Sequence, residues 1–129
     1  MRLRLPSPIA IHEHSPVWTN RLVRKTSPGE WQFRWHPWEE ADGDPEASII
    51  LLAPQTESAW IADCLALLEH VAPQQQVLLL ADLDGSLELM LRDLGVKSVL
   101  AGDVTEAAIL RTLALWRSGT KRIAHGLSC

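Results

Sequence analysis

The stretch from Gln76 to Trp116 constrains the fold most, because its pattern predicts a strand, a helix, a strand and a helix in succession. Residues 77–81 (VLLLA) form a continuous apolar run, typical of a strand buried on both faces of a parallel sheet. Residues 86–94 then carry leucine and methionine at helical spacing, and Gly95 ends that helix. Residues 99–101 predict a second strand and residues 105–116 a second helix. Two strands joined by such a helix lie parallel, with a right-handed crossover.

The two helices of this stretch have predicted caps and faces. Ser86 and Thr105 are the predicted N-caps. The inward faces should contain Leu87, Met90, Leu91 and Leu94 in the first helix and Ile109, Leu110, Leu113 and Trp116 in the second. The outward faces should contain Glu88, Leu89, Arg92 and Asp93 in the first and Ala108, Arg111, Thr112 and Leu115 in the second. Each helix therefore presents one leucine and one arginine to water.

The rest of the chain repeats the alternation. Residues 9–11 predict a strand, and Ser15-Pro16 begins a helix with Ser15 as its N-cap. Residues 30–36 alternate, which predicts a half-buried strand; residues 48–53 (SIILLA) predict a fully buried one; and a helix follows from Thr56 or Ser58 to Val71. This order predicts an α/β fold, a flavodoxin-like three-layer sandwich on a five-stranded parallel sheet of order 2-1-3-4-5. Ligand chemistry in such folds lies at the carboxyl ends of the strands.

Length and composition predict one domain over residues 1–129, with a loose lead-in at 1–8 and a C-terminal tail at 119–129. No apolar run is long enough to span a membrane, and the first residues lack the apolar core of a signal peptide. We interpret Cys64 and Cys129 as free thiols of a protein in a reducing cytoplasm. No Cys-x-x-Cys pair supports a thiolate zinc site.

The net charge of −4 hides a strong segregation along the chain. Residues 1–38 carry six Arg or Lys against two Glu, residues 39–106 carry two against fourteen acidic residues, and residues 107–129 carry four against none. Either the middle segment forms solvated loops and helix starts, or the protein has a two-faced surface that orients a partner.

The strand ends resemble those of response-regulator receiver domains over nearly the whole chain. Residues 95–104 (GVKSVLAGDV) are similar to the receivers' fifth strand, where a Gly-Ala-x-x-Tyr-Leu run precedes Thr-Lys-Pro-Phe. Placed in this way, Gly102 occupies the position of the family's lysine. SIILLA ends with Ala53 at the position of the phospho-accepting aspartate, and VLLLAD places Ala81 at the position of the threonine or serine. Glu13, with a flanking histidine such as His14, occupies the magnesium-binding acidic pair.

The resemblance implies a receiver that has kept the fold and lost the switch. Phosphoryl transfer requires a carboxylate to accept the group, a cation to neutralise it and a hydroxyl to bind it. Ala53, Ala81 and Gly102 supply none of these. We therefore expect a non-enzymatic signalling or protein-interaction module with no cofactor.

Receivers commonly associate through the face that corresponds here to the helix at 86–94, the strand at 99–101 and the helix at 105–116. The expected surface contains Glu88, Leu89, Arg92, Asp93, Arg111 and Leu115. Leucines flanked by mixed charge can form the apolar centre of a self-complementary patch. A weak homodimer or an unknown protein partner is thus expected here, with Arg92 or Arg111 meeting Glu88 or Asp93 of the mate.

Other sites compete with this interpretation. His12, His14 and His36, with Glu13, lie at neighbouring strand ends, which suggests a metal site and a metal- or small-ligand-binding domain. Ser15 offers one hydroxyl at a helix start, which is a poor signal for a flavin or nucleotide. A basic patch at Arg21, Arg24 and Lys25 is too small to predict nucleic-acid binding. The tryptophans at 31, 35 and 38 are either sheet packing or a partner hot spot.

Overall fold

A computed structural model describes residues 7–27, 29–38, 43–54 and 60–126 of the chain, with the backbone alone at 118–126. The strands are β1 (Ile9–Glu13), β2 (Phe33–Pro37), β3 (Ile49–Ala53), β4 (Gln76–Leu80) and β5 (Val96–Leu100). The helices are α1 (Val17–Arg24), α2 (Trp60–Leu68), α3 (Gly85–Asp93) and α4 (Glu106–Gly126). The strands form one parallel sheet in the order β2-β1-β3-β4-β5, which confirms the predicted flavodoxin-like sandwich.

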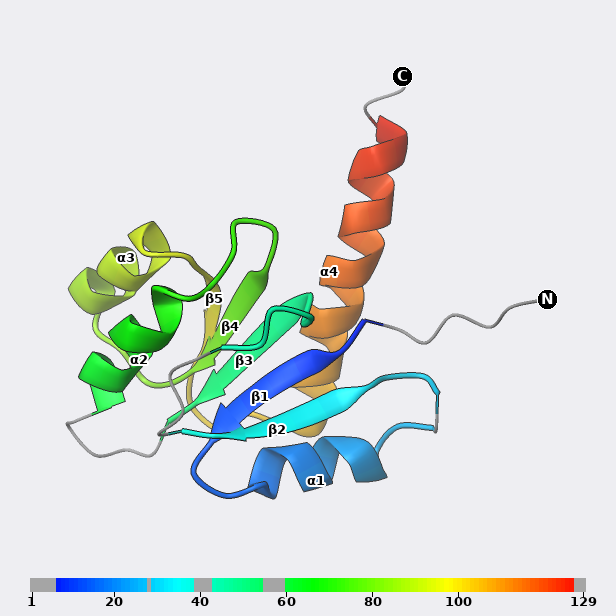
Figure 1. The fold of residues 1–129 in the computed structure, drawn as a ribbon, viewed down its shortest axis with the longest axis horizontal. Helices are drawn as coiled ribbons and strands as arrows, with labels where there is room; N and C mark the ends of the chain where they lie inside the picture. The colour runs from blue at the N-terminus through cyan, green and yellow to red at the C-terminus, as the bar shows by residue number, and fades with distance from the viewer. Residues whose placement is uncertain (1–6, 28, 39–42, 55–59, 127–129) are drawn as a thin grey trace.

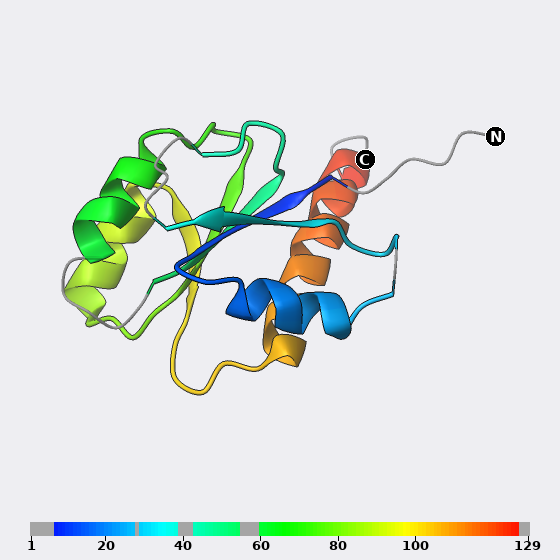
Figure 2. The same cartoon turned by 60° about the horizontal axis from the view of Figure 1, so that its bottom comes forward.

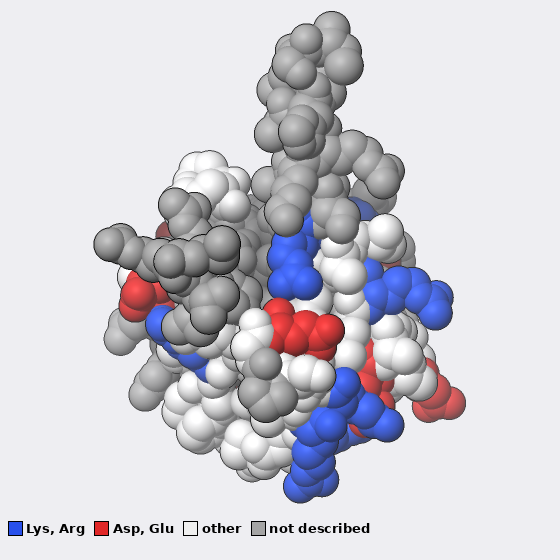
Figure 3. Space-filling view, turned by 90° about the vertical axis from the view of Figure 1, so that its right-hand side faces the viewer, with Lys and Arg blue, Asp and Glu red and all other residues white. Residues whose placement is uncertain are grey.

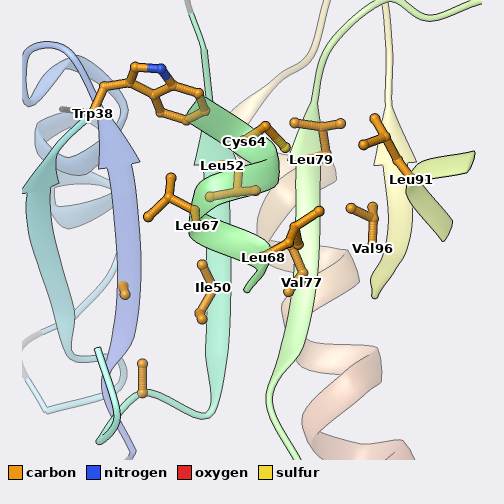
Figure 4. Packing of buried hydrophobic residues seen from close by; sticks show 12 residues of the cluster. Trp38, Ile50, Leu52, Cys64, Leu67, Leu68, Val77, Leu79, Leu91 and Val96 are labelled. Atoms are coloured by element: carbon orange, nitrogen blue, oxygen red, sulfur yellow. The ribbon is translucent and has the colours of Figure 1, made fainter. Parts of the chain in front are cut away.

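Helices cover both faces of the sheet, with α2 and α3 on one side and α1 and α4 on the other (Figures 1 and 2). Successive strand residues point to opposite faces, so β1 sends Ala10 to one core and Ile9 and Ile11 to the other. The first core packs against Cys64, Leu67, Leu68 and Leu91 (Figure 4). The second packs against Leu22, Ile109 and Leu113. This two-sided burial explains why β3 and β4 are continuously apolar in sequence.

The predicted end of α4 differs from the structure. Helix α4 continues to Gly126, well past Trp116, and extends beyond the sheet (Figure 1). Most of the expected tail at 119–129 is therefore helical, and residues 127–129 lie outside the described chain. The inward-facing apolar residues of α4 end at Trp116, where the helix leaves the sheet. No proline follows in residues 117–126, so the backbone hydrogen bonds of the helix continue. Thr56 and Ser58, the predicted starts of α2, also lie outside the described residues.

The predicted caps are partly wrong. Thr105 does cap α4, since its hydroxyl accepts a hydrogen bond from the Ala108 amide at 3.2 Å. Ser86 lies inside α3, whose N-cap is Asp84, with a carboxylate that accepts from the Leu87 amide at 2.8 Å. Gly95 follows α3 with a φ of 121°, as expected of a left-handed helix stop.

Candidate functional site

The carboxyl ends of the strands bring together the positions that the receiver resemblance singled out. Glu13 and Ala53 are register partners at the ends of β1 and β3. Ala81 follows β4, and its amide donates to the Leu100 carbonyl at the end of β5. A pocket of about 540 Å³ lies at this edge and includes both Ala81 and Gly102 in its wall.

Glu13 is a buried helix cap. Its Oε1 accepts a hydrogen bond from the Trp18 amide at 2.9 Å, and its Oε2 accepts from the Thr19 amide at 2.8 Å and the Thr19 hydroxyl at 2.7 Å. Ser15 is the predicted cap of α1, but the structure has Pro16 at the N-cap position. No side chain of the N-cap residue bonds these amides. A carboxylate five residues upstream satisfies them instead, which also suits the positive end of the helix dipole. Both Glu13 oxygens are therefore committed to α1.

Ala53, Ala81 and Gly102, at the expected acceptor, hydroxyl and lysine positions, carry no functional group. Ala53 is buried in the core under α1 and α4, and Ala81 is half-buried. Gly102 is exposed, has a φ of 78°, and donates its amide to the Asp82 carboxylate at 2.7 Å. Methyl groups and a bare backbone can neither accept a phosphoryl group nor neutralise one.

Two tryptophans and two carboxylates give the pocket its chemical character. Its wall consists of Trp18, Pro54, Trp60, Leu80, Ala81, Asp82, Leu100, Gly102, Asp103 and Val104. Trp18 comes from the first turn of α1, and Trp60 from the start of α2. Asp82 follows β4, and Asp103 lies in the connection from β5 to α4. Among these described residues the wall holds no lysine, arginine or histidine, so its charged side chains are the two carboxylates.

The histidines proposed as an alternative metal site do not converge. His12 and His36 are register partners on β1 and β2, and their rings stack at 4.9 Å with an interplanar angle of 17°. His36 Nε2 lies 3.0 Å from an Asp44 oxygen, whereas the His14 ring packs against Trp38 at 5.8 Å. Within the described residues no three histidine, cysteine, aspartate or glutamate side chains are grouped to hold a metal ion.

Burial controls the ionisation of His12. His12 is 1% exposed, and burial together with the charge of His36 lowers its pKa to about 4. Burial would raise the pKa of the Asp44 carboxyl, but hydrogen bonds from His36 and the Glu46 amide, with the charge of Arg34, lower it overall. Neither His12 ring nitrogen has a hydrogen-bond partner among the described residues. His12 is therefore a buried histidine that packs in its neutral form.

Asp44 and Gln75 complete this buried polar cluster, and no sequence pattern predicts the burial of either. Gln75 Nε2 donates to the carbonyls of Asp44 and Ala47, both at 2.7 Å. Asp44 lies in an acidic, turn-rich segment and Gln75 in a run of three glutamines, and neither pattern predicts burial. Their burial depends on how the β2–β3 loop packs over β4, which local patterns do not encode.

The expected interaction surface is exposed in its central residues. Leu89 is 67% exposed and Leu115 is 64% exposed, and Asp93 and Arg111 are exposed as well. Arg92 is already engaged, because it donates to Glu88 at 3.1 Å and to the Lys97 carbonyl at 3.0 Å.

The predicted inward face of α3 is partly wrong. Leu91 is fully buried and Leu87 is half-buried, but Met90 is 41% and Leu94 is 49% exposed. Leu94 lines a shallow apolar groove with Leu65 and Leu68 of α2. The predicted stripe is too wide because α3 contacts the sheet mainly at its outer strand, β5.

The tryptophan cluster near β2 divides between core and surface. Trp38 is fully buried at one end of the core under α2 (Figure 4), whereas Trp35 is 38% exposed and donates its indole N–H to the Glu13 carbonyl at 3.1 Å. Trp31 is partly buried, and the guanidinium of Arg117 lies over its ring at 3.8 Å. Trp38 supports packing, and the other two contribute to both packing and surface.

The basic residues of α1 do not form a continuous surface. The Arg21 guanidinium donates to Glu106 at 3.0 Å and lies 4.0 Å from the centre of the Trp18 ring. Figure 3 shows Lys and Arg side chains in separate groups, with Asp and Glu side chains between them.

Comparison with known proteins does not identify the family of this chain. Within the described residues, no helix combines the length and apolar character required to cross a membrane. No protein-family model and no curated protein matches the chain.

Proposed function

We propose that this chain is a non-enzymatic, receiver-like module that binds a protein partner or a second copy of itself. The observation that carries the proposal is the set of Ala53, Ala81 and Gly102 at three strand ends of a 2-1-3-4-5 sheet. A fold of this order usually places its chemistry there. With no acceptor, hydroxyl or cation at those positions, phosphorylation is not available as the signal. The module would then act by binding a partner through its surface.

The proposed surface is the α3–β5–α4 face, which we define by Glu88, Leu89, Arg92, Asp93, Arg111 and Leu115. Two contacts tie its elements together. Arg92 of α3 donates to the Lys97 carbonyl of β5, and the Lys97 ammonium lies 4.9 Å from the ring centre of Trp116 in α4. These contacts support a preorganised face, which loses less entropy on binding.

The charge pattern of this face suits a two-fold contact. Leu89 and Leu115 would form the apolar centre, and the charged residues would form the rim. Because Arg92 already pairs with Glu88 inside α3, the strongest new ion pair in an isologous dimer would join Arg111 to Asp93 of the mate. The expected association is weak, because one leucine from each helix buries a small apolar area.

Sedimentation velocity of the wild type against Leu89→Glu/Leu115→Glu tests the proposal. We expect a concentration-dependent dimer of the wild type, or co-sedimentation with a partner, that the double variant loses. Val17→Glu/Val23→Glu is the matched control, because these valines of α1 are also more than half exposed. A dimer that survives the leucine substitutions would refute this face. A wild type that stays monomeric at high concentration and binds no partner would refute the module.

A further inference from the structure

The pocket at the strand ends has the dimensions of a ligand site. Its volume of about 540 Å³ falls within the range of about 300–1,000 Å³ that is typical of small-molecule sites. It lies at the carboxyl ends of β3, β4 and β5, where open α/β sheets bind ligands. The proposed interaction surface does not account for it, since none of the residues that define that surface lines the pocket.

The wall favours positive charge combined with a flat or apolar body. Trp18 and Trp60 offer indole rings, whose faces attract cations. Asp82 and Asp103 supply two carboxylates, and the Gly102 amide holds the Asp82 carboxylate in place at 2.7 Å. The remaining wall is aliphatic or backbone. Amines, amidines and guanidinium groups are recognised by this combination of carboxylate and aromatic face.

One cation already contacts the wall. The Arg21 guanidinium lies over the Trp18 ring at 4.0 Å, which shows that this indole accepts a cation–π contact. Its charge is balanced by Glu106 at 3.0 Å, and the hydrogen bond from Arg21 lowers the pKa of that carboxyl. Arg21 therefore adds little net positive potential to the pocket.

Helix N-termini at this edge would by themselves favour an anion. Three of them are already satisfied by side chains of the protein. Glu13 accepts from the first amides of α1, Asp84 caps α3, and Thr105 caps α4. The carboxylates of Glu13 and Asp84 also offset the dipoles of their helices. The carboxylates in the wall then determine the charge of the preferred ligand, which should be positive.

We propose that this pocket binds a small organic cation, with its charged amine, amidine or guanidinium group between Asp82 and Asp103 and its body against Trp18 and Trp60. A receiver site takes a phosphoryl group and magnesium. This pocket would instead take an organic cation at the same edge of the sheet.

Three probes of one shape and different charge test the proposal: benzamidine (positive), benzamide (neutral) and benzoate (negative). Each is titrated into the full chain while amide chemical shifts are followed by NMR. We expect saturable benzamidine shifts at residues 80–82 and 100–104, with a Kd of about 1 mM as befits a fragment-sized ligand. Benzamide should bind about tenfold more weakly, and benzoate should not bind.

Asp82→Asn/Asp103→Asn should weaken benzamidine binding about five- to tenfold, because each exposed ionic contact is modest. Asn at position 82 keeps an oxygen for the Gly102 amide, so the fold is preserved, and circular dichroism verifies it. Asp63→Asn/Glu69→Gln removes the same charge from exposed sites in α2 and directly after it, and should leave the Kd unchanged. Equal binding of benzamide, stronger binding of benzoate, an unaffected Asp82/Asp103 variant, or no saturable shift would each overturn the proposal.

Discussion

Glu13 occupies a position that the receiver resemblance assigns to a magnesium ligand, but its carboxylate has another task in this chain. Three hydrogen bonds from Trp18 and Thr19 make it the cap of α1. The sequence placed Glu13 correctly at a strand end, yet Ser15 offered the more usual cap. Only the path of the β1–α1 turn decides which oxygen reaches the first amides.

Replacing Glu13 with alanine should lower the free energy of unfolding by about 1–3 kcal/mol, because buried amides lose their acceptor. Glu13→Gln keeps one acceptor oxygen and should cost less. Urea unfolding followed by circular dichroism measures both variants. Equal stability of Glu13→Ala and the wild type would show that the carboxylate is not the cap of α1.

His12 makes the stability of the fold depend on pH. Its pKa is about 4 in the folded chain, against 6.5 for an unperturbed histidine. The unfolded chain therefore binds the extra proton between these values, and stability falls as the pH drops from 6.5 to 4. The loss should reach roughly 3 kcal/mol across this window, with no contribution from His12 above it.

The matched variants are His12→Leu, which should remove most of this slope, and His70→Leu, at an exposed histidine, which should keep it. Chemical unfolding at intervals across this pH window provides the measurement. A wild-type free energy of unfolding that stays flat between pH 6.5 and 4 would contradict the burial of a neutral His12.

At the scale of the element, the apolar runs predicted β3 and β4 well, because a strand buried on both faces has no alternative exposed side. Residues that depend on neighbouring elements were predicted less well. Met90 and Leu94 followed the helical period, but α3 covers only the edge of the sheet and leaves them half in solvent. Asp44 lies in an acidic, turn-rich loop and is buried by the packing of that loop.

Leu79 of β4 tests the buried strand directly. It is fully buried among side chains from both neighbouring strands and the helices above them. Leu79→Ala should lower the free energy of unfolding by about 2–5 kcal/mol through lost burial and a residual cavity. Leu89→Ala, at an exposed leucine of α3, should change it by less than about 0.5 kcal/mol. Similar losses from the two variants would contradict the assignment of β4 as a central strand.

At the scale of the whole molecule, alternating elements were enough to predict the 2-1-3-4-5 sheet, because right-handed crossovers leave few other arrangements. The pocket was not predicted. Its tryptophans come from the starts of α1 and α2 and its carboxylates from two separate loops, and only the closed fold brings these segments together. Trp18 and Trp60 were assigned to no site for this reason.

We propose that this chain keeps a receiver-like fold and lacks the phosphorylation switch of that family. Amide NMR spectra of the protein, recorded with magnesium and increasing beryllofluoride, test this proposal. Beryllofluoride mimics a bound phosphoryl group, and acetyl phosphate, which donates one, is the second reagent. Ala53, Ala81 and Gly102 give such a group no attachment, so the spectrum should stay unchanged. A saturable, magnesium-dependent shift centred on residues 81–84 and 100–103 would contradict the account.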